Sequence, residues 1–449
     1  MSVGFAVLLV AGVMAVLLLL RMPVWLALAI SGAAGLLALR DAKFVTSSLA
    51  TASFEQASSF TLTIIPMFIL LGVFAVRAKV AEQVFTIARR AFRNIPGGLG
   101  ISTVAACAGF AAVSGSSIGT AATMSKLSVT EMRKAGYPTS LAGALVAVAG
   151  TLGAMIPPSL FLVLYAILSS ESIGKMLIAG IVPGFLSAVA YAIYVYFRTR
   201  KLPQIADDAT LEVGLNEAIS DSQARGQRLR LPWRGLIRLI IIFVIIMGGI
   251  YTGFFTPTES AAIGALAALI MLILEYRNRG IREITRQLNE ALKETAKTTS
   301  MVFAIMIGSA LLSLFFVVAR VPQMISDSVT GLPLPPWLIV ALLLALLLPL
   351  GMALESISIL VITVPLIYPV AMELGFDGIW LGIMIVKLIE IGMVTPPVGI
   401  NCFVVAGTAK IPTAEVFKGI WPFVLIEIGL LVLFFVLPDL ILWLPAVVQ

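Results

Sequence analysis

Long apolar runs separated by short polar segments make up most of the chain. A helix of roughly 18 to 25 apolar residues can cross the hydrocarbon core of a bilayer. Transmembrane helices are predicted at residues 3–20, 22–39, 60–78, 140–168, 175–197, 236–255, 258–276, 298–319, 378–407 and 415–440. Two further apolar stretches, 99–127 and 334–370, are interrupted by small or charged residues and are typical of re-entrant hairpins. The pattern predicts an all-α polytopic membrane protein.

The runs at 140–168 and 378–407 contain the same interruption. Gly153-Ala-Met-Ile-Pro-Pro158 in the first run returns 239 residues later as Gly392-Met-Val-Thr-Pro-Pro397 in the second. Proline removes an amide donor and clashes with the preceding helical turn, which frees backbone carbonyl groups at membrane depth. We therefore expect two broken helices whose free carbonyls can bind a cation.

At the same offset, the match continues without a gap from about residue 114 to residue 183. The paired positions include Ser117/Ser356, Ile118/Ile357, Leu127/Leu366, Gly136/Gly375, Gly143/Gly382, Gly180/Gly419, Ile181/Ile420 and Pro183/Pro422. These pairs indicate an internal duplication. Duplicated halves with matched, interrupted apolar segments are typical of secondary transporters that bind substrate at the repeat interface. We expect a first repeat at 1–198, a linker at 199–235 and a second repeat at 236–449.

The basic residues predict the orientation of the chain in the membrane. With the N-terminus outside, the cytoplasmic segments hold most of the lysines and arginines, as the positive-inside rule requires. Each half then contains five spans and one hairpin, and this odd number inverts the second half relative to the first. The first hairpin enters from the cytoplasm and the second from outside, while the linker is a solvated cytoplasmic segment. Amphipathic stretches at 80–96 and 279–297 suit helices that lie along the membrane surface. Such helices either brace a scaffold or are ordinary loop helices.

Composition excludes most soluble functions. The 449 residues are 60% hydrophobic and 12% charged, so most of the surface must be solvated by lipid or by other membrane helices. The chain contains no histidine, which excludes histidine general bases, Ser/His triads and histidine metal clusters, and we do not expect an enzyme. The net charge of +7 does not indicate nucleic-acid binding, because the basic residues flank apolar spans. Cys107 and Cys402 lie within apolar segments, which argues against a disulfide framework.

Small and hydroxyl residues fill the tip of the first hairpin, from Ala112 to Thr123. Such residues either pack helices closely or supply oxygen ligands in place of water. The segment 114–117 aligns with 353–356, which follows Pro349-Leu-Gly351. Both halves therefore place a helix breaker and polar atoms at equivalent hairpin tips.

These tips and breaks predict two sites for a hard monovalent cation such as sodium, which binds several carbonyl, hydroxyl or carboxylate oxygens at broken helix ends. The first candidate sodium site joins Ser114 and Ser116 with the carbonyls of Gly153, Ile156 and Pro157. The second joins Gly351, Gly392, Thr395 and Val398. An anionic substrate would lie between the tips, facing helix N-termini, and would be lined by Ser116, Ser117, Glu355, Ser356 and Asn401.

Charged residues within predicted spans are candidates for function because their burial is costly. Lys387 and Glu390 are three residues apart on one helix, so they either neutralise each other as a structural pair or serve the site. Glu355 has no obvious partner in the sequence and is the stronger candidate for a functional carboxylate. Glu259, in Thr256-Pro-Thr-Glu259, is predicted to cap a helix N-terminus.

Five motifs along the chain are highly specific in combination. They are Ser114-Gly-Ser-Ser-Ile-Gly-Thr-Ala-Ala-Thr-Met124, Glu131-Met-Arg-Lys-Ala-Gly-Tyr137, Gly150-Thr-Leu-Gly-Ala-Met-Ile-Pro-Pro-Ser159, Gly253-Phe-Phe-Thr-Pro-Thr-Glu259 and Glu390-Ile-Gly-Met-Val-Thr-Pro-Pro-Val-Gly-Ile-Asn401. With these motifs, nearly the whole chain resembles the large membrane subunit (DctM type) of tripartite ATP-independent periplasmic (TRAP) transporters.

The resemblance implies a sodium-coupled, elevator-type transporter of the bacterial inner membrane, in which hairpins and broken helices move against a scaffold. It also implies a separate four-helix membrane subunit (DctQ type) and a periplasmic binding protein (DctP type) that delivers an organic acid. Family frequency favours a small carboxylate such as a C4-dicarboxylate. The chain has Glu355 where many members carry Asp, and Thr120 where some sialic-acid-type members carry Asp, so the substrate stays open.

Three other functions compete with a binding-protein-dependent importer. A self-sufficient sodium-coupled anion carrier could use the same architecture. A passive channel fits less well, because two hairpins closing from opposite sides suit alternating access. An intramembrane enzyme fits least, because the chain lacks histidine and has no paired carboxylates in facing spans.

Overall fold

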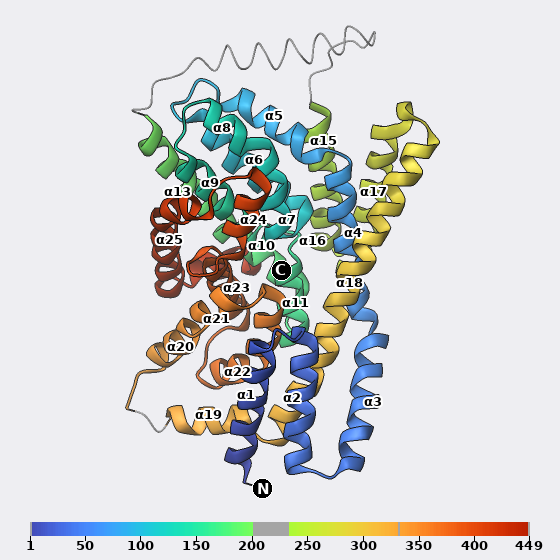
Figure 1. Cartoon of the computed structure of the whole chain (residues 1–449), viewed down its shortest axis with the longest axis vertical. Coiled ribbons are helices and arrows are strands. Elements are labelled where there is room, and N and C mark those ends of the chain that lie inside the picture. The colour runs from blue at the N-terminus through green and yellow to red at the C-terminus, as the bar shows by residue number, and fades with distance from the viewer. Residues whose placement is uncertain (1, 201–232, 331–332, 448–449) are drawn as a thin grey trace.

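The computed structural model describes residues 2–200, 233–330 and 333–447, and the described part of the chain is helical throughout (Figure 1). Among these described residues, six helices are long and apolar enough to cross a membrane, or seven if the bent pair 139–155 and 160–169 forms one span. Shorter apolar helices accompany them. The all-α polytopic fold is therefore confirmed, although fewer helices than the ten predicted runs reach spanning length by themselves. Most of the predicted linker falls on 201–232, outside the described residues.

The first half contains thirteen helices, joined in places by single 3₁₀ or π turns. They are α1 (Val3–Leu19), α2 (Val24–Leu39), α3 (Ala42–Ser58), α4 (Ile64–Arg77), α5 (Val80–Phe92), α6 (Gly98–Ser114), α7 (Ser117–Met124), α8 (Thr130–Lys134), α9 (Thr139–Gly150), α10 (Leu152–Met155), α11 (Leu160–Ser169), α12 (Ile173–Ala179) and α13 (Ile181–Thr199). Helix α3 is not among the predicted runs. Its sequence is rich in serine and threonine, and Asp41 caps it by accepting a hydrogen bond from the Phe44 amide (3.2 Å).

The described part of the second half follows after the linker. Its helices are α15 (Trp233–Phe243), α16 (Gly249–Tyr251), α17 (Pro257–Tyr276), α18 (Ile281–Val318), α19 (Val321–Thr330), α20 (Pro336–Ala345), α21 (Leu347–Ala353), α22 (Ser356–Glu373), α23 (Gly378–Val394), α24 (Ile400–Ala409), α25 (Thr413–Val436) and α26 (Asp439–Val447). Thr256 and Glu259 form a reciprocal capping box at the start of α17, which confirms the predicted role of Glu259.

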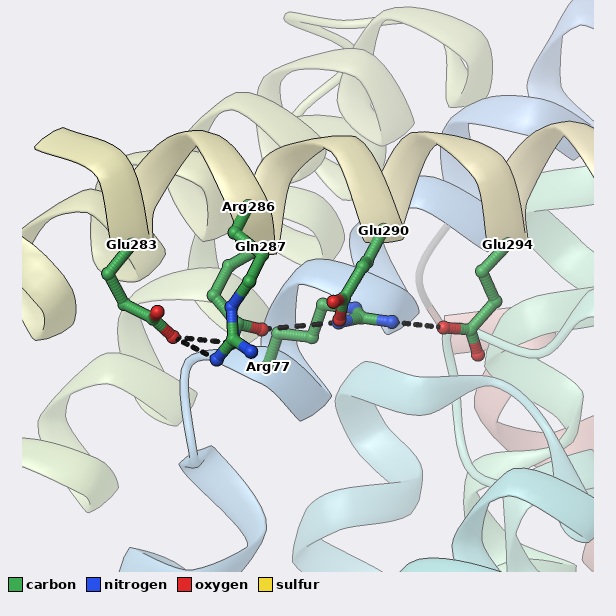
Figure 2. A network of polar contacts seen from close by, with 6 residues as sticks. All are labelled: Arg77, Glu283, Arg286, Gln287, Glu290 and Glu294. Carbon is green, nitrogen blue, oxygen red and sulfur yellow. Dashed lines mark hydrogen bonds and ion pairs between the residues drawn. The ribbon is translucent and has the colours of Figure 1, made fainter.

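Helix α18 runs through most of the length of the molecule and packs against α2, α3 and α4 (Figure 1). The sequence predicts a surface stretch and a separate span here, but one uninterrupted helix of 38 residues contains both. In its polar half, Glu290 and Glu294 accept hydrogen bonds from Arg77 at the end of α4, at 2.7 and 2.9 Å (Figure 2). These two ion pairs fix the end of α4 to α18.

The hairpins and the broken helices form the other group of packed elements. Helices α6 and α7 make the first hairpin, and α20, α21 and α22 make the second. Helix α7 packs against α9, α10 and α24, while α21 packs against α23. Helices α6, α11 and α22 connect this group to α4 and α18, because α6 and α11 contact α4 and α22 contacts α18. The candidate site lies where the hairpins meet the broken helices.

Candidate transport site

The tip of the first hairpin is a tight turn between α6 and α7. Gly115 has a φ of 60°, which reverses the chain after Ser114 at little steric cost because glycine lacks a Cβ. Ser116 caps α7 by accepting a hydrogen bond from the Gly119 amide (3.2 Å). The hydroxyls of Ser114 and Thr120 lie 2.7 Å apart across the turn. The turn therefore brings several hydroxyl oxygens together at one point.

This tip rests directly on the break between α10 and α11. A Cβ on Gly153 would lie 2.6 Å from the Ser116 carbonyl oxygen, and a Cβ on Gly115 would lie 2.7 Å from the Pro158 carbonyl oxygen. The Leu160 amide donates a hydrogen bond to the Gly115 carbonyl (3.3 Å). The structure therefore brings Ser114 and Ser116 to the segment 153–158 that contains the other members of the first candidate sodium site, Gly153, Ile156 and Pro157.

Two further hydroxyls at this contact are not in the predicted site. Ser159 is fully buried, caps α11 and donates a hydrogen bond to the Ala154 carbonyl across the break. Thr120 is also fully buried and faces Ser114. A serine directly before an apolar helix is a capping signal that identifies Ser159 in the sequence. Thr120 is one of the hydroxyl residues of the predicted hairpin tip, and the turn folds it back onto Ser114.

The residues of the second candidate sodium site lie at the crossing of α21 and α23. A Cβ on Gly392 would lie 2.6 Å from the Gly351 Cα atom, so the two backbones are in direct contact. Thr395 ends α23, and its amide donates to the Gly392 carbonyl (3.1 Å) while its hydroxyl donates to the Ile391 carbonyl (2.6 Å). Val398 lies beyond Thr395 in the break before α24 and is 38% exposed. The structure thus groups Gly351, Gly392 and Thr395, with Val398 at the edge.

Both hairpin tips contact the last turns of α23. The Ser117 hydroxyl donates to the Glu390 carboxylate (3.1 Å), and the Ser356 hydroxyl contacts the Met393 sulfur atom. Glu390 and Met393 are three residues apart, so they lie on one face of the helix. Ser117 begins α7 and Ser356 begins α22, so two helix N-termini meet α23 just before its break. Helix N-termini carry partial positive charge and favour anions.

The other predicted substrate residues differ in their surroundings. Glu355 is partly buried at the start of α22, and the Ser358 hydroxyl donates to its carboxylate (3.3 Å). Asn401 is fully buried on α24, which packs against α7. Neither the nitrogen nor the oxygen of its side-chain amide has a hydrogen-bond partner among the described residues. Such a buried amide is a candidate for binding a ligand or water.

Lys387 forms its ion pair with Glu427 of α25, so the alternative in which Lys387 and Glu390 neutralise each other as a structural pair is wrong. The Lys387 ammonium also donates to the Ser187 hydroxyl (2.5 Å), and Tyr191 donates to Glu427. This buried cluster joins α13, α23 and α25. Lys387 is neutralised there, and one carboxylate oxygen of Glu390 has no hydrogen-bond partner among the described residues.

Comparisons with known proteins agree on one family. The family model described as "Tripartite ATP-independent periplasmic transporter, DctM component" matches residues 11–440. The chain is 36% identical over 400 residues to a C4-dicarboxylate TRAP transporter large permease protein of Pseudomonas aeruginosa, covering 89% of each chain. It is 32% identical over 387 residues to a sialic acid TRAP transporter large permease protein of Vibrio cholerae, covering 86% of each.

A solved structure has the same overall fold. It is the crystal structure of the YdaH transporter of Alcanivorax borkumensis, which is described as having an unusual topology. The TM-score is 0.61, the sequence identity is 16%, and the match covers 88% of each chain. At this identity the likeness concerns the fold alone.

Proposed function

The chain belongs to the DctM family of tripartite ATP-independent periplasmic transporters, and on this basis we propose that it is the sodium-coupled subunit that imports an organic acid. The family assignment agrees with the resemblance seen in the sequence motifs. It also agrees with the expectation of a multi-pass protein of the bacterial inner membrane that is a permease subunit and not an enzyme. The observation that carries the proposal is the meeting of both hairpin tips on α23, one turn before its break.

Sodium coupling is supported by the oxygen atoms at the two breaks. At the first break, the Ser116 carbonyl and the Thr120 hydroxyl lie close to Gly153, and the Ser114 hydroxyl faces Thr120. At the second, Thr395 follows the close contact of Gly351 with Gly392. A helix that stops within an apolar region leaves carbonyls that a cation can bind. Sodium would be bound there together with substrate, and no other cofactor is proposed.

An anionic substrate is supported by the two helix N-termini and by Asn401. The start of α7 and the start of α22 would face the anion, and the free Asn401 amide can donate to a carboxylate. The relatives named for a C4-dicarboxylate and for sialic acid both transport organic acids according to their names. We favour a small carboxylate, such as a C4-dicarboxylate, which the chain would bind through Ser116, Ser117, Ser356 and Asn401, with Glu355 at the edge.

An elevator movement is supported by the two groups of helices. Helices α2, α3, α4, α17 and α18 form one set of packed helices, in which α18 contacts α2, α3 and α4 and α17 contacts α4, while α7 packs with α9 and α24 and α21 packs with α23. The second group would move as a body against the first. The duplication is supported by Gly136 and Gly375, which are 239 residues apart, share a φ of 81°, and precede α9 and α23.

Two partners complete the proposed transporter. One is a four-helix membrane subunit of the DctQ type, and the other is a periplasmic binding protein of the DctP type that delivers the substrate. The alternative is a self-sufficient sodium-coupled anion carrier that needs no binding protein. The fold is compatible with either function, because the candidate transport site lies entirely within this chain.

Uptake by proteoliposomes distinguishes the two functions. The vesicles would contain this chain and the small subunit, with an inward sodium gradient, labelled organic acids, and the binding protein present or omitted. We expect uptake that needs both sodium and the binding protein. Sodium-driven uptake without the binding protein would establish the self-sufficient carrier. If the protein were a channel, the rate of uptake would not saturate as the substrate concentration rises. Uptake that does not depend on sodium would overturn the proposal.

A further inference from the structure

A positively charged groove lies at the start of α18, away from the candidate transport site. Its lining residues are Arg279, Arg282, Glu283, Thr285, Arg286 and Asn289. Three arginines face one glutamate in this groove. A concave surface with excess positive charge attracts anionic groups.

The one acidic side chain of the groove is already paired. Glu283 accepts hydrogen bonds from Arg286 (2.6 Å) and from Gln287 (2.9 Å), as Figure 2 shows from the side of α18. The Arg279 guanidinium lies over the Tyr276 ring, 5.4 Å from its centre. Arg282 is exposed and has no ion pair with any residue that the structure describes. The groove therefore keeps positive charge that this part of the chain does not neutralise.

Backbone amides add to this charge. Gly280 precedes α18 with a φ of 90°, and no side chain caps the helix at this position. The first amides of an α-helix have no acceptor within the helix and bind anions readily. Here they point toward the same end of the helix that carries Arg282 and Arg286.

The groove lies at the level of lipid headgroups. Helix α17 has 20 residues, is apolar, and ends at Tyr276. At about 1.5 Å per residue it spans the hydrocarbon core, which places the arginines that follow it at the headgroup level. The positive-inside rule assigns this end to the cytoplasmic leaflet, where anionic lipids are attracted to clusters of basic residues. Ile281 beside the groove is 78% exposed and can contact acyl chains.

We propose that this groove binds the headgroup of an anionic phospholipid of the cytoplasmic leaflet. The phosphate would lie between Arg279, Arg282 and Arg286, near the first amides of α18. Bound lipid would hold the polar half of α18 at the membrane surface. Since Glu290 and Glu294 join this half to Arg77, the lipid would also steady the end of α4.

Native mass spectrometry of the purified full chain, titrated with phosphatidylglycerol or phosphatidylcholine, tests the proposal. We expect phosphatidylglycerol to bind at least tenfold more tightly than phosphatidylcholine. An arginine near a membrane surface contributes about fivefold in affinity, so R282Q/R286Q should lose about 25-fold for phosphatidylglycerol. Glu283→Gln should bind phosphatidylglycerol more tightly than wild type, a gain that an unfolded variant could not give.

The matched control is K293Q/K297Q, which removes the same charge from exposed positions of α18 outside the groove. It should keep the wild-type affinity for phosphatidylglycerol. Three results would overturn the proposal: wild-type binding by R282Q/R286Q, an equal loss in the control, or displacement of the lipid by an equal concentration of inorganic phosphate. The last result would make the groove a site for free phosphate.

Discussion

Ser117 and Glu390 are 273 positions apart in the chain, and the Ser117 hydroxyl donates a 3.1 Å hydrogen bond to the Glu390 carboxylate. Both side chains are buried, at 0% and 3% exposure. The contact joins the tip of the first hairpin to α23. One turn further along α23, Met393 contacts Ser356 at the tip of the second hairpin.

Ser117→Ala should lower the free energy of unfolding by about 1–3 kcal/mol, because the buried Glu390 carboxylate loses its hydroxyl donor. Denaturant titration in detergent micelles measures the change. Ser125→Ala is the matched control, since Ser125 is equally buried but donates only to Ala121 of the preceding turn. Equal stability of the two variants would show that the contact with Glu390 contributes nothing.

Asn401→Leu should lower uptake at least tenfold while leaving stability unchanged or raised. The amide has no partner among the described residues, so an apolar side chain of similar size removes an unsatisfied polar group. Substrate uptake and the midpoint of thermal unfolding are measured on the same preparation. Normal uptake would remove Asn401 from the substrate site, and a large loss of stability would assign it a structural role.

Lys387→Met should destabilise the protein by about 3–5 kcal/mol, because it leaves the Glu427 carboxylate buried without its cation. Adding Glu427→Gln should restore most of the loss, since the double variant no longer leaves the Glu427 carboxylate buried without its cation. Thermal unfolding of both variants checks this. A single variant as stable as wild type would contradict the pairing.

Gly392→Ala should destabilise the protein by about 1–3 kcal/mol, because its Cβ would lie 2.6 Å from the Gly351 Cα and force the α21–α23 crossing apart. Gly407→Ala in α24 is the control, since a Cβ there meets nothing within 4 Å. The control should be neutral or gain up to about 1 kcal/mol from its better helix propensity. Similar losses in both variants would show that helix crossing is not the cause.

The sequence predicts the helical fold and the tips of both hairpins, because apolar runs, glycines and prolines determine where helices form and break within a local segment. Helix α3 is not predicted, because its polar sequence lacks an apolar run. Helix α18 is predicted as two pieces because hydropathy changes near residue 298, but no proline lies between Ile281 and Val318, so nothing ends the helix.

The partner of Lys387 could not be predicted from spacing. Glu390 is a neighbour on the same helix, whereas Glu427 lies 40 residues further along the chain and reaches Lys387 only through packing of α25 on α23. The same holds for Ser117 and Glu390. Contacts between distant elements depend on how helices pack, and the pattern along one helix does not contain that information.

The central claim, sodium binding at the two breaks, is tested most directly by the sodium dependence of uptake in proteoliposomes. Ser114→Ala and Thr395→Ala each remove one hydroxyl from a candidate site, and both should need several-fold more sodium for half-maximal uptake. Thr363→Ala is the control, because its buried hydroxyl bonds only to Ile359 of its own helix. Sodium activation curves like wild type in both site variants would contradict the account.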